Sequence, residues 1–184
     1  GFCRSYKVRT TPSFYDIPVV YITTENGRHI TSKEDYVRGS FSMRTPSDSD
    51  FAPVGEKAIS IKGRGNSTWN WPKKPYRIKF DHKISLFGLP KAKNWVLLAN
   101  YADRSLIRNQ VAMAMAQPLG RLSYVPAMKP VDLFVNGVYQ GVYSLSERIE
   151  ENDGRVELDV SASEDTGYLL EVGGVESEEL GIKK

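Results

Sequence analysis

The sequence has one cysteine, Cys3, and two histidines, His29 and His82. A single cysteine excludes a disulfide within the chain, and this cysteine and histidine content excludes a zinc site built from those residue types. No stretch approaches the roughly 20 apolar residues of a membrane span, and no signal-peptide pattern is visible. These features leave the compartment open, and a chain that starts at Gly1 is compatible with prior removal of an export signal. We expect an extracytoplasmic or cell-surface location.

Excess charge of one sign is also scarce, because the formal net charge is +3 over 184 residues. This value is too small to indicate nucleic acid as a partner. The basic residues concentrate between Lys57 and Lys93, which favours a local anionic ligand. With 40% apolar residues the chain can bury a core of ordinary size. We expect one β-rich domain over residues 1–184, with a peripheral arm at 1–15 and a frayed end at 176–184.

The most informative stretch is residues 59–80. Apolar side chains alternate with polar ones on both sides of a polar loop, at Ile59, Ile61, Tyr76, Ile78 and Phe80. This period of two predicts two strands that place their apolar side chains on one face and the cations Arg77 and Lys79 on the other.

The loop of this hairpin contains the candidate ligand-binding residues Arg64, Gly65, Asn66 and Ser67. Small residues allow tight backbone geometry and expose main-chain N–H groups, so the loop and the neighbouring Lys79 can hold phosphate. A solvated hairpin loop is the alternative interpretation. Neither standard phosphate signature is complete, because Thr68 replaces the third glycine of the dinucleotide pattern and no Gly-Lys-Ser/Thr sequence is present.

The sequence outside residues 59–80 predicts several further strands. Further strands are predicted at 17–22, 29–30, 36–43, 94–99, 130–135, 138–145, 155–160 and 167–172. Asn136-Gly137 is the strongest hairpin signal in the sequence, so Asn136 is interpreted as a turn residue.

One main helix is predicted at about 103–117. Asp103 or Ser105 can cap its start, and Pro118 with Gly120 ends it. Its apolar stripe consists of Leu106, Ile107, Val111, Ala114 and Met115.

Two arginines four residues apart, Arg104 and Arg108, share a face of this helix near its start. One interpretation is a solvated basic face. The other is that Arg108 and Asn109 contact a phosphate beneath the glycine-bearing loop.

Several motifs together resemble the CotH (spore coat protein H) kinase-like family. They are Lys-Gly-Arg-Gly-Asn-Ser-Thr-Trp at 62–69, Lys-Lys-Pro-Tyr-Arg-Ile-Lys-Phe at 73–80, Asn-Trp-Val-Leu-Leu-Ala-Asn-Tyr at 94–101, Asp-Arg-Ser-Leu-Ile-Arg-Asn at 103–109 and the run from Val131 to Tyr143. The resemblance covers roughly residues 15–170 in the same order. It implies an α+β fold, a mostly antiparallel sheet with one main helix, similar to the N-terminal lobe of an atypical protein kinase.

The resemblance also implies a function. Members of this family resemble kinases that use ATP and a divalent metal such as Mg²⁺ to phosphorylate proteins, so we expect a nucleotide and a protein substrate as partners. A kinase-like layout places Glu147 where it contacts the nucleotide or pairs with Lys79; an exposed glutamate at a strand end is the alternative. The expected helix has no glutamate in its middle to pair with Lys79.

The catalytic and metal-binding aspartates of the resembled family lie in a second lobe, well after the segment corresponding to residues 143–147. No part of this sequence resembles that pair, and we assign no role to Asp159 or Asp165. We therefore expect the nucleotide-facing N-terminal part of a kinase-like protein, without kinase activity by itself.

A second hypothesis comes from another class of protein. Trp69 and Trp71 are flanked by amide and hydroxyl groups, a composition that suits stacking on sugars. The alternative function is therefore a secreted, non-catalytic β-rich module that binds carbohydrate or protein.

Overall fold

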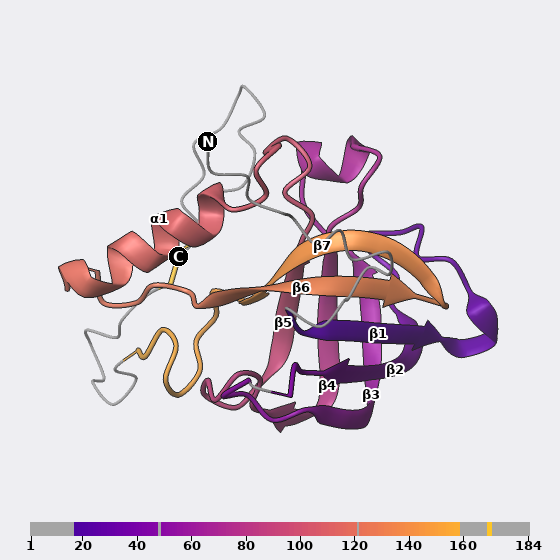
Figure 1. Cartoon of the computed structure of the whole chain (residues 1–184), viewed down its shortest axis with the longest axis horizontal. Helices are drawn as coiled ribbons and strands as arrows, with labels where there is room; N and C mark the ends of the chain where they lie inside the picture. Colours follow the sequence, from indigo (N-terminus) through magenta and orange to yellow (C-terminus); the bar gives the residue numbers. More distant parts are fainter. Residues whose placement is uncertain (1–16, 48, 121, 159–168, 171–184) are drawn as a thin grey trace, which may run out of the picture.

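The structure is a computed structural model that describes residues 17–47, 49–120, 122–158 and 169–170. Seven strands in this part of the chain form one sheet that closes into a barrel, in the order β1-β2-β3-β4-β5-β7-β6 (Figure 1). The strands are β1 (Val19–Thr24), β2 (Val37–Arg44), β3 (Val54–Gly63), β4 (Tyr76–Ile84), β5 (Ala92–Leu98), β6 (Met128–Val135) and β7 (Val138–Glu147).

The barrel closes where β1 meets β6. These two strands run parallel, with Val19 opposite Asp132 and Ile22 opposite Val135, whereas every other neighbouring pair is antiparallel. The turn residue Asn136 strengthens the closure, because its backbone N–H donates to the Ile22 carbonyl at 2.8 Å and its side-chain oxygen accepts from the Thr24 N–H at 2.8 Å. The first strand is thereby joined to a segment more than 100 residues away.

The predicted α+β fold is wrong. The described residues form a mostly β structure, a closed seven-stranded barrel with one short helix, and not the N-terminal lobe of a kinase. Alternating apolar residues predict strands but not whether the outer strands of a sheet meet. Here the parallel pairing of β1 with β6 removes both sheet edges, and a barrel results.

The core lies inside the barrel. The largest side chains with almost no exposed surface are Trp95, Tyr143, Phe41, Phe80, Ile22, Met43, Ile59, Ile61, Ile78, Leu86, Leu97 and Leu133. Full burial of one such side chain stabilises the fold by roughly 1.5–3 kcal/mol. The predicted hairpin around residues 59–80 is confirmed, because β3 and β4 pair with Ile61 opposite Ile78 and Ile59 opposite Phe80.

The helix α1 (Arg108–Ala116) is shorter than the predicted range of 103–117. Leu106 has a φ of +63°, which is incompatible with a helix, so residues 103–107 form a loop. A 3₁₀ turn over Gln117–Leu119 follows α1, and no residue of α1 is buried.

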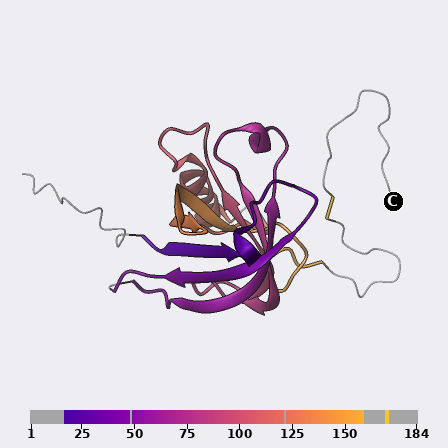
Figure 2. The same ribbon diagram turned by 90° about the vertical axis from the view of Figure 1, so that its right-hand side faces the viewer.

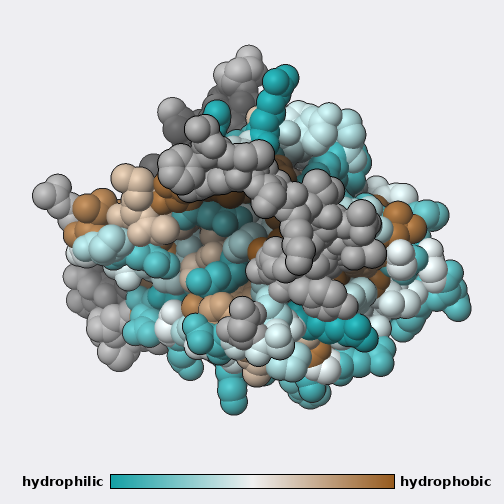
Figure 3. All heavy atoms as spheres, viewed as in Figure 1, coloured by the Kyte–Doolittle hydropathy of each residue, from teal (hydrophilic) through white to brown (hydrophobic). Residues whose placement is uncertain are grey.

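An exposed apolar stripe follows the helix. Figure 3 shows brown and tan spheres at the left, in the region where Figure 1 places α1. The exposed apolar side chains of this part of the chain are Ile107, Val111, Met115, Leu119 and Leu122. Ile107, Val111 and Met115 of the predicted stripe are thus exposed, whereas Leu106 lies in the loop before α1. The described residues leave this stripe uncovered.

Three of the shorter predicted strands do not form within the described residues. No strand forms at 29–30, because Glu25–Gly27 makes a 3₁₀ turn and the chain then runs irregularly to β2. The described part of 155–160 makes only an isolated bridge between Glu151 and Val156. Of 167–172 only 169–170 are described, and they are irregular; the arm at 1–15, the end at 176–184, Asp159 and Asp165 lie outside the described residues.

Two long loops lie at the same end of the barrel. One joins β3 to β4 and carries a 3₁₀ turn, η2 (Ser67–Asn70), and the other joins β5 to α1. Figures 1 and 2 show them side by side above the sheet. The antiparallel pairing of β4 with β5, with Tyr76 opposite Leu97, brings the two loops together. Within the described residues, no helix is both long and apolar enough to cross a membrane.

Candidate functional site

The glycine that ends β3 and the one that follows in the β3–β4 loop are both required by packing. A Cβ on Gly63 would lie 2.3–2.8 Å from three ring atoms of Trp69. Gly65 has a φ of +90°, and a Cβ there would lie 2.1 Å from the Thr68 hydroxyl. The loop therefore folds back on itself, with the Trp69 ring lying over the end of β3.

Two lysines fix this loop. The ammonium of Lys73 donates to the Val142 carbonyl and lies 4.4 Å from the centre of the Tyr143 ring, and burial lowers its pKa. Lys74 donates to the Trp69 carbonyl at 2.7 Å, while the Tyr143 hydroxyl donates to the Lys74 carbonyl at 2.9 Å. These contacts tie the loop to β7, so both lysines have a structural role.

The β5–α1 loop contains two strained residues. Asn100 and Leu106 both have positive φ, +49° and +63°, a conformation rare for a bulky residue such as leucine. The Asn100 amide donates to the Leu106 carbonyl at 3.2 Å and to the Ser144 hydroxyl at 2.8 Å, and its oxygen accepts from the Asn109 amide at 2.9 Å. Strain of this kind persists where surrounding contacts over-determine the backbone, and it concentrates at functional sites.

Asp103 organises the start of α1. One carboxylate oxygen accepts from the Ser105 N–H at 3.0 Å and the Ser105 hydroxyl at 2.7 Å, and the other accepts from the Arg108 N–H at 2.9 Å. The Ser105 hydroxyl bond, followed by the Arg108 backbone bond, lowers the pKa of Asp103. The Arg108 guanidinium lies 3.4 Å from the same carboxylate, with 82% of its side chain exposed.

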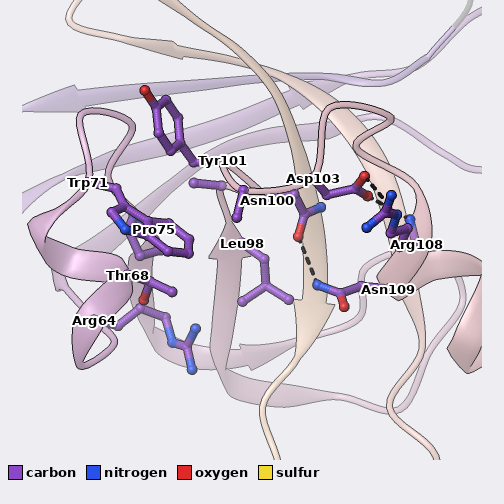
Figure 4. Close-up of a pocket in the computed structure, with 12 residues that line it drawn as sticks. Arg64, Thr68, Trp71, Pro75, Leu98, Asn100, Tyr101, Asp103, Arg108 and Asn109 are labelled. Atoms are coloured by element: carbon purple, nitrogen blue, oxygen red, sulfur yellow. Dashed lines mark hydrogen bonds and ion pairs between the residues drawn. The ribbon is translucent and has the colours of Figure 1, made fainter.

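A pocket of about 410 Å³ lies between the two loops. The β3–β4 loop lines it with Arg64, Thr68, Trp71 and Pro75. The end of β5, the following loop and α1 line it with Leu98, Asn100, Tyr101, Asp103, Arg108 and Asn109, together with the two alanines at 99 and 102. Figure 4 shows Arg64 on one side and Arg108 on the other, with Leu98 and Asn100 between them. Two arginines thus line one pocket, one from the β3–β4 loop and the other from the start of α1.

Four of the predicted ligand-binding residues belong to the β3–β4 loop. Arg64 lines the pocket, whereas Gly65, Asn66 and Ser67 belong to the same loop without lining it. Arg108, the predicted contact from the helix, lines the same pocket on the opposite side from Arg64.

Lys79 lies on the outer face of the barrel and does not line the pocket. It pairs with Asn94 in the sheet, and Asn94 precedes the pocket residue Leu98 by four positions along β5. At about 3.3 Å per residue, Asn94 and Leu98 are about 13 Å apart along β5, so Lys79 lies beside a part of β5 that is distant from the pocket.

Glu147 lies elsewhere, buried at the end of β7. It pairs with Trp95 in the sheet, one residue after the Asn94 that pairs with Lys79, so Glu147 and Lys79 are on opposite faces. Its carboxylate accepts from the Ala127 N–H at 2.9 Å and lies 3.5 Å from Arg155. Glu147 therefore pairs with Arg155.

The pocket residues that sequence reasoning missed come mainly from the β5–α1 loop. Asp103 was interpreted only as a cap, and Tyr101 and Asn100 were not considered as ligand contacts. The signal that could have found them is the antiparallel order of β4 and β5, which places the loop before β4 beside the loop after β5.

Comparison with known families gives one match in this part of the chain. The family model described as CotH kinase protein matches residues 61–182. The match begins within β3 and includes all the residues that line the pocket. No curated protein matches the chain.

Proposed function

We propose that this chain, which belongs to the CotH kinase family, binds ATP in the pocket between the β3–β4 loop and the β5–α1 loop. In this proposal the pocket is the nucleotide-binding part of a CotH-type kinase-like domain that transfers a phosphoryl group to protein. The proposed protein acceptor rests on the family resemblance alone, and an extracytoplasmic or cell-surface location is part of the same proposal.

The observation that carries the proposal is that Arg64 and Arg108 line one pocket from opposite sides. A guanidinium group presents several N–H donors in a planar fork that matches phosphate oxygens. Arg108 contributes an exposed cation, and its contact with Asp103 is a solvent-screened one that a polyphosphate can replace. The volume of about 410 Å³ is within the range of small-molecule pockets.

The described residues do not supply a metal site. They contain no group of three or more histidine, cysteine, aspartate or glutamate side chains that could hold a metal ion. The one carboxylate in the pocket, Asp103, accepts hydrogen bonds on both oxygens. We therefore propose that Mg²⁺ enters as the complex with ATP, and that these residues bind and orient the polyphosphate.

The chemistry of phosphoryl transfer defines what these residues contribute. The reaction requires compensation of phosphate charge and a carboxylate that orients the acceptor hydroxyl. Arg64 and Arg108 meet the first requirement. Asp103 is committed to the start of α1, so we assign it no role with the acceptor.

The test is a calorimetric titration of ATP, with and without Mg²⁺, into the whole chain and the Arg108→Ala variant. Arg104→Ala is the matched control, because Arg104 is exposed, lies four residues away and does not line the pocket. We expect Arg108→Ala to weaken ATP binding about tenfold or more, since bonds to charged groups contribute about 1.5–3 kcal/mol. Arg104→Ala should leave the affinity within about twofold. Equal affinities in the two variants, or no saturable binding, would refute the proposal.

The carbohydrate-binding alternative retains one supporting observation, the position of Trp71 and Tyr101 in the pocket. Its other residue, Trp69, packs its ring against Gly63 and the core, which leaves it unsuited to sugar stacking. Titration of the same protein with oligosaccharides tests this alternative. Saturable sugar binding that is lost in Trp71→Ala, together with no ATP binding, would favour it.

A further inference from the structure

Two aromatic side chains meet at the pocket although they come from different loops. Trp71 directly follows η2 in the β3–β4 loop, and Tyr101 lies in the loop after β5. Their ring centroids lie 6.0 Å apart with an interplanar angle of 41°. Tyr101 is 48% exposed and neither ring belongs to the buried core, so core packing does not account for the pair.

The pocket is chemically divided. Figure 4 shows Trp71, Pro75 and Tyr101 on one side and Asp103, Arg108 and Asn109 on the other. Arg64 lies below the rings, on their side of the pocket. Leu98 lies between the two halves. A ligand that fills the pocket therefore needs a flat apolar part beside the rings and an anionic part that Arg108 and Arg64 can bind.

We infer that Trp71 and Tyr101 form the platform on which the nucleobase stacks, with the phosphates directed toward Arg108. This inference rests on the proposed function and extends it by assigning the two ends of the nucleotide to the two halves of the pocket. Aromatic rings stack on the π-face of any base, and this kind of contact tolerates different bases. The platform selects by ring area, so purine nucleotides bind more tightly than pyrimidine nucleotides, with ATP and GTP similar.

The experiment separates the two halves by using two probes, ATP and inorganic triphosphate, which lacks the base. Each is titrated into the wild-type chain and into Trp71→Ala, Tyr101→Ala and Arg108→Ala. Tyr139→Ala is the control, since Tyr139 is 44% exposed, similar to Tyr101, and does not line the pocket. Loss of one base–aromatic contact corresponds to about tenfold in affinity.

We expect Trp71→Ala and Tyr101→Ala each to weaken ATP about tenfold and to leave triphosphate binding unchanged. Arg108→Ala should weaken both probes, and Tyr139→Ala neither. Trp71→Phe keeps a ring and should retain most of the ATP affinity, which guards against a loop that simply fails to fold in Trp71→Ala. ATP should also quench tryptophan fluorescence in the wild type but not in Trp71→Phe, and triphosphate should quench neither.

The outcomes distinguish this inference from the proposed function. If the alanine variants of the two rings weaken ATP and triphosphate equally, or weaken neither, the platform is refuted while the pocket remains a nucleotide site. CTP binding as tight as ATP would refute it as well. If the wild-type chain binds neither probe, the proposed function fails and the platform fails with it.

Discussion

The Glu147 carboxylate lies 3.5 Å from the Nε of Arg155, and both side chains are buried. Arg155 also donates to the Asn94 carbonyl at 2.9 Å and to the Glu150 carboxylate at 2.7 Å. Its guanidinium lies over the Trp95 ring, 4.9 Å from the centroid. One buried arginine therefore fastens the segment after β7 to the first residues of β5, at the end of β5 away from the pocket.

Arg155→Met is expected to destabilise the fold by about 3–5 kcal/mol, because it leaves the Glu147 carboxylate buried without its cation. Urea unfolding followed by circular dichroism measures this. The double variant Glu147→Leu/Arg155→Met should recover much of the loss, since the buried charge of Glu147 is then removed and Glu150 keeps its ion pair with Arg148. Arg38→Met is the control, because the ion pair of Arg38 with Asp81 is exposed and its loss should change stability little. A change below about 1 kcal/mol in Arg155→Met would contradict a structural role for the pair.

The acid stability of the fold should depend on Asp103. Hydrogen bonds from the Ser105 hydroxyl and the Arg108 N–H lower its pKa below the ordinary value of 3.8. A lowered pKa in the folded state means that the carboxylate stabilises the protein above pH 3.8 and that this contribution is lost as the pH falls through the folded pKa. Asp103→Asn should therefore lower the melting temperature at pH 6, and the difference from wild type should vanish at strongly acidic pH.

Thermal melts from pH 2 to pH 7 provide that measurement. Glu56→Gln removes an exposed carboxylate of β3 and serves as the control. A constant difference between Asp103→Asn and wild type over the whole range would show that the ionised carboxylate is not what stabilises the start of α1.

The hairpins of this fold could be predicted from the sequence because they depend on local signals. Alternation around residues 59–80 predicted the β3–β4 hairpin with its apolar face, and the Asn136-Gly137 turn predicted the β6–β7 hairpin. Closure of the barrel could not be predicted, because it depends on the pairing of Ile22 with Val135, which lie far apart in the chain. No residue pattern within either strand encodes that partner, and the fold class was therefore wrong.

The sequence predicted some residues of the candidate site and misplaced others. Arg64 and Arg108 were predicted as phosphate contacts from their positions in a glycine-bearing loop and at a helix start, and they line one pocket. An ion pair between Lys79 and Glu147, one of the interpretations of Glu147, depends on strand register. A shift of one residue changes the face of a strand, so Glu147, opposite Trp95, cannot meet Lys79, opposite Asn94.

The stripe along α1 should tolerate polar substitution. Val111 and Met115 are 47% and 66% exposed, so a glutamine at either position removes little buried apolar surface. We expect Val111→Gln and Met115→Gln to change the free energy of unfolding by less than about 0.5 kcal/mol. Leu97→Ala is the comparison, because Leu97 is fully buried and its truncation should cost about 2–5 kcal/mol. A cost near that of Leu97→Ala would mean that the stripe is covered in solution.

Gly63 is predicted to be intolerant of any side chain, because a Cβ there would overlap the Trp69 ring. Gly63→Ala should destabilise the fold by about 1–3 kcal/mol, the usual cost of overpacking. Gly55, also in β3, has no atom within 4 Å of a Cβ position, so Gly55→Ala is the matched control and should be nearly neutral. The double variant Gly63→Ala/Trp69→Ala removes the overlap, and should be less destabilised than the sum of the two single variants. Additive costs in urea unfolding would contradict direct packing of Trp69 on Gly63, and with it the structural explanation for the first glycine of the loop.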